Sequence, residues 1–201
     1  MLTLGVVLAG GRGTRLGLDV PKALASCGGR TLLERALETI APLCDDVVIV
    51  APREMELPVL LARRVDDPPG EKGPLPALLA GLASRTFDEA LVLAVDMPLV
   101  TLHALRALRA LRARALAVIT APGGVWQPLA AWYASGAREP LERAHATGER
   151  SVIVACRILD PVIVDDEALS TLEGGDGFRW NVNTADDLAR AERSLGARAA
   201  S

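Results

Sequence analysis

The chain has 201 residues, of which half are apolar and only 3% aromatic, and its formal net charge is -3. This length suits a single domain over residues 1–201, with a core built mainly from aliphatic side chains. Charges of both signs are spread along the chain, so the composition gives no reason to expect a nucleic-acid or membrane partner.

The three cysteines, Cys27, Cys44 and Cys156, are far apart in the sequence. No pair has metal-ligand spacing, so we expect free thiols in a reducing compartment. A reactive thiol is disfavoured because neither His103 nor His145 lies near a cysteine in the sequence. The N-terminus lacks the basic start of a secretory signal, and no apolar run reaches the ~18 residues that span a bilayer. We therefore expect a soluble, cytoplasmic protein.

Continuous apolar runs predict four buried strands, at Leu4–Leu8, Val47–Val50, Ala90–Val95 and Leu116–Ile119. Runs that do not alternate with polar residues are typical of strands covered on both faces. Amphipathic segments predict four helices, at Thr31–Ile40, Leu75–Ala83, Thr101–Arg114 and Thr184–Leu195. The first begins with Thr31 and has Glu34 three residues later, which is the pattern of a capping box. Strands that alternate with helices predict an α/β fold with a doubly wound, mostly parallel sheet and helices on both faces.

Two regions allow more than one interpretation. Residues 125–164 mix prolines and glycines with short apolar runs, and we interpret them as an elaboration that completes a binding pocket, not as a second domain. The predicted helix 101–114 carries a series of arginines, which could form a basic binding patch. The favoured interpretation is the solvated face of a helix whose leucines are buried.

A glycine-rich segment follows the first strand at once, with the sequence Leu8-Ala9-Gly10-Gly11-Arg12-Gly13-Thr14-Arg15, and Lys22 closes it. In open α/β sheets, ligands bind outside the carboxyl ends of the strands. Glycines allow the backbone N–H groups of a turn to approach a phosphate closely. Arg12, Arg15 and Lys22 add positive charge, so we predict a phosphate-binding loop and not a plain turn.

Two better-known phosphate loops do not fit this segment. A Walker A loop needs lysine directly after glycine and before Ser or Thr, whereas Lys22 follows Pro21. A dinucleotide-binding fingerprint needs its last glycine one residue earlier than Gly17, and Pro21 indicates an extended segment in place of a helix. Hydride transfer to a dinucleotide is therefore the weaker hypothesis.

Acidic residues with a possible role in binding lie in two other segments, the end of a predicted strand and a loop rich in turn formers. Asp96 lies at the carboxyl end of the third predicted strand, and Pro98 turns the chain away. Mg²⁺ prefers such hard oxygen ligands and needs only one or two carboxylates besides phosphates. A helix cap is the alternative role, but Thr101 is better placed for it. Asp66 or Asp67 could accept hydrogen bonds from a base or a ribose, or could simply be solvated in a surface turn.

The C-terminal third holds a pair of asparagines, Asn181 and Asn183, on the same face of an extended segment before the last helix. Their amides offer both donors and acceptors. They could bind an acceptor substrate, help to hold the metal, or simply form a polar approach to a capped helix. The sequence has no catalytic-looking arrangement of His, Ser or Cys, which favours chemistry without a protein nucleophile.

Together these motifs resemble those of the molybdenum cofactor guanylyltransferases over nearly the whole chain. The matching segments are Leu8-Ala9-Gly10-Gly11, Lys22, Asp66 seven residues before Gly73-Pro74-Leu75, Asp96-Met97-Pro98, Gln127-Pro128-Leu129, Gly148-Glu149-Arg150-Ser151-Val152 and Asn181-Val182-Asn183-Thr184. The sequence departs from that family at Val50-Ala51-Pro52-Arg53, where the family often has Val-Asn-Ala-Asn-Arg. The sequences Gly-Thr-Arg-Leu and Pro-Lys in the first loop resemble those of the sugar-phosphate nucleotidyltransferases.

The resemblance implies a Rossmann-like nucleotidyltransferase that moves GMP from GTP to Mo-molybdopterin, releases pyrophosphate and uses Mg²⁺ as cofactor. It implies transient contact with molybdoenzymes or other cofactor-assembly proteins, and it makes residues 125–164 an acceptor-side elaboration. The implied nucleotide-binding residues are Leu8, Ala9, Gly10, Gly11, Lys22, Asp66 and Asp96. The implied catalytic residues are Arg15, Lys22 and Asp96, with Asp96 as the metal ligand. The acceptor-binding candidates are Arg150, Asn181 and Asn183.

Two other functions remain open from the sequence. The nearer one is another Mg²⁺-dependent nucleotidyltransferase, either a molybdopterin cytidylyltransferase or a sugar-1-phosphate nucleotidyltransferase. The remote one is a non-catalytic nucleotide-binding module, which Lys22 and Asp96 together disfavour.

Overall fold

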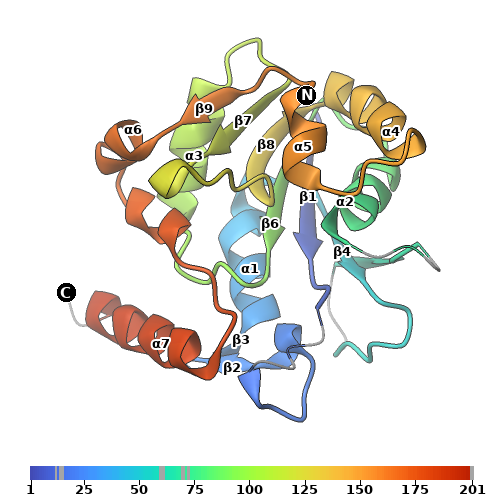
Figure 1. Cartoon of the computed structure of the whole chain (residues 1–201). Helices are drawn as coiled ribbons and strands as arrows, with labels where there is room; N and C mark the ends of the chain where they lie inside the picture. The colour runs from blue at the N-terminus through green and yellow to red at the C-terminus, as the bar shows by residue number, and fades with distance from the viewer. Residues whose placement is uncertain (12, 14–15, 59–61, 69–70, 72, 200–201) are drawn as a thin grey trace.

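The structure is a computed structural model that describes residues 1–11, 13, 16–58, 62–68, 71 and 73–199. Its centre is a seven-stranded sheet with the strand order β5-β4-β1-β6-β8-β7-β9 (Figure 1). The strands of this sheet are β1 (Thr3–Leu8), β4 (Asp46–Ala51), β5 (Arg63–Asp66), β6 (Glu89–Ala94), β7 (Ala117–Thr120), β8 (Ala130–Ala134) and β9 (Val162–Val164). Strand β8 runs antiparallel to both of its neighbours, and the other pairs are parallel.

Helices cover both faces of this sheet. They are α1 (Leu32–Ile40), α2 (Pro74–Ala83), α3 (Leu102–Leu111), α4 (Arg138–Ala146), α5 (Val152–Arg157), α6 (Asp166–Ser170) and α7 (Ala185–Ala199). One apolar core includes side chains from α1, α3, α6 and α7, and a second includes side chains from α2, α4 and α5. Two cores separated by one sheet make the fold doubly wound, and the predicted fold class is confirmed.

Short elements complete the chain. The 3₁₀ helices are η2 (Lys22–Leu24), η3 (Ala41–Leu43), η4 (Pro122–Gly124), η5 (Ser135–Ala137) and η6 (Gly175–Arg179). A small antiparallel ribbon pairs β2 (Ser26–Cys27) with β3 (Arg30–Thr31). It leads into α1, where Thr31 and Glu34 form the predicted capping box: the Thr31 hydroxyl accepts from the Glu34 N–H, and the Glu34 carboxylate accepts from the Thr31 N–H. This box satisfies two N–H groups that a helix start otherwise leaves free.

The four predicted strands and four predicted helices are present, with ends that differ by a few residues. Strands β5, β8 and β9 and helices α4, α5 and α6 were not predicted. Strand β8 lies between β6 and β7, so residues 125–164 contribute to the middle of the sheet, where Trp132 and Tyr133 are fully buried. The division of the chain into a single domain with an acceptor-side elaboration stays a prediction.

The arginines of α3 are not only a solvated face. Arg109 and Arg112 form ion pairs with Glu89, whose side chain is only 2% exposed at the start of β6. Thr3 donates a hydrogen bond to the same carboxylate, and the Arg109 guanidinium also lies over the Trp132 ring. A buried carboxylate is tolerated when it is paired in this way. Arg109 and Arg112 therefore stabilise the amino-terminal end of strand β6.

The three cysteines are free thiols. Burial raises the pKa of Cys44 to about 12 and that of Cys156 to about 11. Burial also raises the pKa of Cys27. Because the thiolate is the nucleophilic form, these three groups are poor nucleophiles at neutral pH. In the described part of the chain, the helices are too short or too polar to cross a membrane.

Candidate nucleotide-binding site

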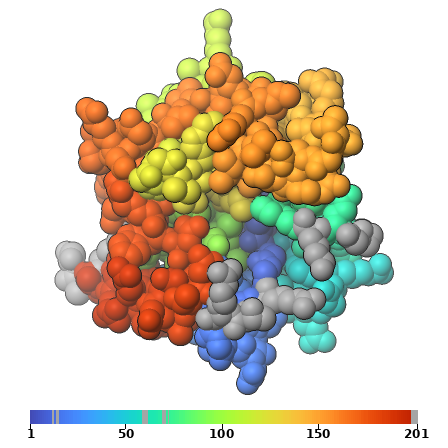
Figure 2. Space-filling view, in the orientation of Figure 1, coloured from blue at the N-terminus to red at the C-terminus, as the bar shows by residue number. Residues whose placement is uncertain are grey.

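A cavity of about 340 Å³ lies at the carboxyl ends of β1, β5 and β6. Its wall consists of small and apolar residues with two carboxylates, namely Leu8, Gly10, Gly11, Asp67, Gly73, Pro74, Ala77, Ala94, Val95, Asp96 and Leu129. Figure 2 shows the corresponding hollow in the middle of the face in view, with β1 and β6 visible at its bottom. An apolar pocket with a few convergent polar groups, at this edge of an α/β sheet, is the arrangement expected of a small-molecule site.

The glycine-rich loop folds over the backbone of Lys22. Gly13 has a φ of +62°, and a Cβ atom there would lie 3.1 Å from both the Lys22 backbone N and its Cβ. A larger residue would be strained by its backbone conformation and crowded by Lys22. The predicted catalytic residue Arg15 and its neighbours Arg12 and Thr14 lie outside the described residues. The described glycines leave the main chain open to the cavity, as phosphate binding requires.

Lys22 brings together three parts of the chain that are distant in sequence. Its side chain is only 11% exposed. Its Nζ donates to Asp96 Oδ2 at 3.1 Å and to Asn183 Oδ1 at 3.0 Å, across sequence separations of 74 and 161 residues. Pro21 fixes the start of η2, which places Lys22 at the first position of this short helix. Three residues predicted to belong to the site therefore meet at one point.

Asp96 follows β6 directly and reaches the cavity. Its carboxylate is 25% exposed, and its carbonyl O accepts a 2.7 Å hydrogen bond from the Val182 N–H. Among the described residues, no group of three or more His, Cys, Asp or Glu side chains is arranged to hold a metal ion. A single carboxylate open to a phosphate-sized cavity fits Mg²⁺, which keeps waters and takes its remaining ligands from substrate phosphates.

The loop after β5 places Asp67 on the cavity wall and leaves Asp66 outside the cavity lining. The Asp66 carboxylate is 48% exposed and pairs with Arg64, at 2.9 Å, and with Arg53, at 3.9 Å. Asp67 Oδ2 lies 3.7 Å from where a Cβ on Gly10 would be. Successive side chains of an extended segment point to opposite sides, so a shift of one residue decides which carboxylate faces the ligand.

The carboxylate of Asp67 has an unusual environment. Its Oδ1 is buried without a hydrogen-bond partner in the described part of the structure. Burial raises the pKa of this carboxyl group, and the charges of Glu54 and Asp66 raise it further. A buried acceptor without a partner is costly, and a ligand that donates to it would remove the cost. Asp67 was one of two alternatives in the sequence, and the assignment of Asp66 stays a prediction.

The asparagine segment is held by the start of α7. Asp187 Oδ2 accepts from the N–H groups of Asn183 and Thr184, and the Thr184 hydroxyl accepts from the Asp187 N–H. The side chain of Thr184 contributes most to lowering the pKa of Asp187, followed by the N–H of Asn183. Asn181 Oδ1 is buried without a hydrogen-bond partner in the same part of the structure. The arrangement fixes Asn183 toward Lys22 and leaves Asn181 with a free acceptor.

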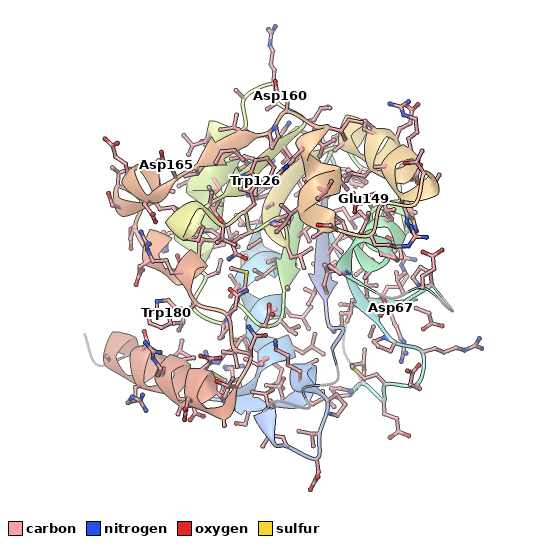
Figure 3. The ribbon with its side chains drawn as sticks, viewed as in Figure 1. Asp67, Trp126, Glu149, Asp160, Asp165 and Trp180 are labelled. Atoms are coloured by element: carbon pink, nitrogen blue, oxygen red, sulfur yellow. The ribbon has the colours of Figure 1, made fainter. Side chains whose placement is uncertain are left out.

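Arg150 does not line the cavity, although its carbonyl O lies 3.8 Å from where a Cβ on Gly73 would be. Its guanidinium is 2.9 Å from His145 Nδ1, and His145 Nε2 is 2.5 Å from the Glu71 carboxylate. Because arginine only donates, Nδ1 of His145 is the acceptor in this contact. In Figure 3, Asp67 and Trp180 lie on opposite sides of the face in view, and Glu149, the residue before Arg150 in the sequence, lies above Asp67.

The fold and the site together are those of a nucleotide-binding α/β domain: a glycine loop and Asp96 line one pocket, and Lys22 is paired with Asp96. Residues 5–160 match the model of the MobA-like NTP transferase domain. The chain belongs to the MobA-like NTP transferase family. A probable molybdenum cofactor guanylyltransferase of Chloroflexus aggregans is 36% identical, over 98% of this chain and 96% of that protein.

Further relatives agree with this family. The molybdenum cofactor guanylyltransferase of Ectopseudomonas mendocina is 34% identical, over 96% of this chain and 93% of that protein. The crystal structure of a molybdopterin-guanine dinucleotide biosynthesis protein A from Archaeoglobus fulgidus has a TM-score of 0.78 and 29% identity, and the match covers 96% of this chain and 98% of that one. A 2-C-methyl-D-erythritol 4-phosphate cytidylyltransferase from Thermus thermophilus, at 20% identity and a TM-score of 0.69, shares the fold.

Proposed function

We propose that this protein transfers GMP from GTP to the terminal phosphate of Mo-molybdopterin, releases pyrophosphate and requires Mg²⁺, in the cytoplasm. The observation that carries the proposal is the meeting of Lys22 and Asp96 at a cavity that the glycine loop borders. The guanylyltransferases named above are similar over nearly their whole length, which supports GTP and a molybdopterin acceptor. The product would pass by transient contact to molybdoenzymes or other cofactor-assembly proteins.

The phosphates of GTP would lie along the glycine loop and reach Lys22. The acceptor phosphate is already ionised at neutral pH, so it can attack the α-phosphorus in line without a protein base. Catalysis then consists of positioning and of charge stabilisation. The ammonium of Lys22 would offset charge on the α-phosphate and on the leaving pyrophosphate, and Arg15 is proposed to assist. Asp96 would hold Mg²⁺, which supplies charge neutralisation between the phosphates.

Asp67 supports guanine as the preferred base. Guanine carries two neighbouring donors, the ring N1–H and the 2-amino group, and a carboxylate can accept from both. The free Oδ1 of Asp67 and its position opposite Gly10 suit this role. Cytosine offers only its amino group at the corresponding edge, so the same carboxylate would bind CTP less well. On this account Asp67, and not Asp66, contacts the nucleotide base.

The acceptor would bind on the other side of Asp96 from the nucleotide. Asn181 has a buried carbonyl oxygen that lacks a partner in the described residues, which suits a donor on the pterin ring system. Asn183 contacts Lys22 and so lies beside the reacting phosphates. Arg150 would need to leave its contact with His145 in order to reach an acceptor phosphate.

The direct test combines binding with turnover. Thermal unfolding with Mg²⁺ and each of GTP, CTP, ATP and UTP should show the largest shift with GTP, because selective binding stabilises the folded state. Pyrophosphate release should then require Mo-molybdopterin as well as GTP, and sugar 1-phosphates should not replace it. Release with CTP, or with a sugar 1-phosphate, would instead identify one of the alternative transferases.

Asp96→Ala is the matching variant. We expect it to keep the fold and to lower the rate of pyrophosphate release by about 10²–10³ or more, as for the loss of other preorganised groups that stabilise charge. The rate should be compared with that of Asp160→Ala, an exposed acidic residue in the turn between α5 and β9. Near-normal activity of Asp96→Ala would remove Asp96 from the mechanism.

A further inference from the structure

The ammonium of Lys22 lies where a divalent cation would have to bind. It is 3.1 Å from Asp96 Oδ2, and the Lys22 side chain is only 11% exposed. A divalent cation at the same carboxylate oxygen would lie close to this ammonium and would be repelled by it, since the charges are only partly screened in such a site. In this structure Lys22 therefore acts as the counter-ion of Asp96.

This position of Lys22 is built by several parts of the fold. Asn183 accepts a second hydrogen bond from the ammonium, at 3.0 Å. The Asn183 N–H in turn donates to Asp187 in the first turn of α7, and the next residue back, Val182, donates its N–H to the Asp96 carbonyl. The glycine loop crosses the base of the same side chain at Gly13. Contacts from several segments of the chain therefore fix the position of the ammonium.

We propose that Asn183 is a positioning residue that holds Lys22 on Asp96 in the resting protein, so that a divalent cation binds at Asp96 only together with a nucleoside triphosphate. The triphosphate offers Lys22 a new set of anionic oxygens, and the flexible four-carbon stem allows the ammonium to move to them. Asp96 is then free for the cation that arrives with the phosphates. This inference rests on the proposed nucleotide transfer and adds the order in which the site is filled.

The inference has a measurable consequence in the unmodified protein. Because binding free energies are reciprocal, the nucleotide must tighten cation binding by the same factor by which the cation tightens nucleotide binding. We expect this factor to be about tenfold or more. It can be measured with Mn²⁺, followed by its electron paramagnetic resonance signal, and with an α,β-methylene analogue of GTP, which cannot be cleaved at the reacting bond.

Lys22→Gln tests the role of the ammonium directly. In this variant Mn²⁺ alone, without nucleotide, should bind about tenfold or more tightly than in the wild type, because Asp96 has lost its counter-ion. Asn183→Ala should shift Mn²⁺ binding in the same direction by a smaller factor. Arg157→Gln, which removes one exposed positive charge from α5, is the charge-matched control and should leave Mn²⁺ binding unchanged.

The double variant Lys22→Gln/Asp96→Asn should lose the added Mn²⁺ binding, which assigns it to Asp96. Thermal unfolding establishes that each variant is folded, and the wild-type coupling measurement stands even if one is not. Equal Mn²⁺ affinity with and without the analogue, or unchanged Mn²⁺ affinity in Lys22→Gln, overturns the inference while nucleotide binding persists. Failure of the wild type to bind the analogue at all overturns the proposed function as well.

Discussion

Strand β6 carries a carboxylate at each end, and the two are held in different ways. Glu89, at its start, is 2% exposed and is bound by Arg109, Arg112 and Thr3. Asp96, just beyond its end, is 25% exposed and is bound by Lys22. The arginines come from the last turn and the C-cap of the packed helix α3, whereas the lysine comes from the short helix η2, after a glycine loop that borders a cavity.

The difference agrees with the proposal that Glu89 is a structural charge and Asp96 a functional one. A buried carboxylate that is enclosed by two guanidinium groups loses too much if one partner leaves, so it stays paired. A carboxylate that is bound to one flexible ammonium and is open to a cavity can exchange its partner for a metal ion or a substrate. If so, substitutions at the amino end of β6 should mainly change stability, and substitutions at its carboxyl end should mainly change binding and catalysis.

The largest expected effect on stability is at Glu89. Glu89→Ala should lower the free energy of unfolding by about 3–5 kcal/mol, because it leaves Arg109 and Arg112 without their buried counter-charge. Urea unfolding measures the loss. The neighbouring variant Asp88→Ala, whose carboxylate is 60% exposed, should cost less than about 1 kcal/mol. Equal losses for the two variants would contradict the structural role of Glu89.

At the cavity, Asp67→Asn should weaken GTP binding by about 1.5–3 kcal/mol, the usual contribution of a hydrogen bond to a charged group. Isothermal titration with Mg²⁺·GTP measures it. Asp66→Asn is the matched control one residue away, and its carboxylate faces Arg64 in place of the cavity. A larger loss in Asp66→Asn than in Asp67→Asn would restore the assignment that the sequence motif favoured.

Asp67→Asn should increase the thermal stability of the protein although it weakens GTP binding. The folded state raises the pKa of Asp67, so at neutral pH the fold carries the cost of keeping this carboxyl group ionised. Asp67→Asn should therefore unfold at a higher temperature than the wild type at pH 7. The difference should shrink as the pH falls through the raised pKa, because the wild-type group then becomes neutral. A pH-independent difference would contradict this explanation.

The smallest expected effect is at the start of α7. Asp187→Ala removes an acceptor for the Asn183 and Thr184 N–H groups and should cost about 1 kcal/mol of stability. The pKa of Asp187 is lowered in the folded state, so its contribution is present above the pKa of the unfolded chain and is lost as the pH falls through the folded value. Thermal unfolding should show a smaller loss at pH 3 than at pH 7.

Asp186→Ala provides the comparison for that variant, since Asp186 lies in the same first turn of α7 and is exposed. It should change stability by a few tenths of a kcal/mol through the helix dipole alone. If Asp186→Ala costs as much as Asp187→Ala, the hydrogen bonds to the asparagine segment are not what Asp187 contributes.

The sequence was most informative where the local pattern was strong. Long apolar runs predicted β1, β4, β6 and β7, and the capping box predicted the start of α1. Strand β8 escaped prediction because its sequence, Ala130–Ala134, is short and rich in alanine, and only its neighbours in the sheet make it a strand. The Lys22–Asp96–Asn183 contact also could not be derived from local sequence, because it joins segments that only the folded chain brings together.

The choice between Asp66 and Asp67 shows the limit within the site itself. Spacing to the Gly73-Pro74-Leu75 motif favoured Asp66, but the facing of side chains depends on the register at which β5 pairs with β4. That register pairs Ala51 with Asp66 and is followed by a hydrogen bond from the Asp67 N–H to the Ala51 carbonyl. A sequence motif does not specify strand register to a single residue, and a shift of one residue changes which side chain faces the cavity.

The most direct test of the account compares the two ends of β6 in one assay. Pyrophosphate release from GTP and Mo-molybdopterin is measured for Glu89→Gln and Asp96→Asn, and each rate is divided by the concentration of folded protein. We expect Glu89→Gln to unfold more easily yet to retain the wild-type rate per folded molecule. Asp96→Asn should remain folded and release almost no pyrophosphate. A wild-type rate in Asp96→Asn, or loss of activity in fully folded Glu89→Gln, would contradict the account.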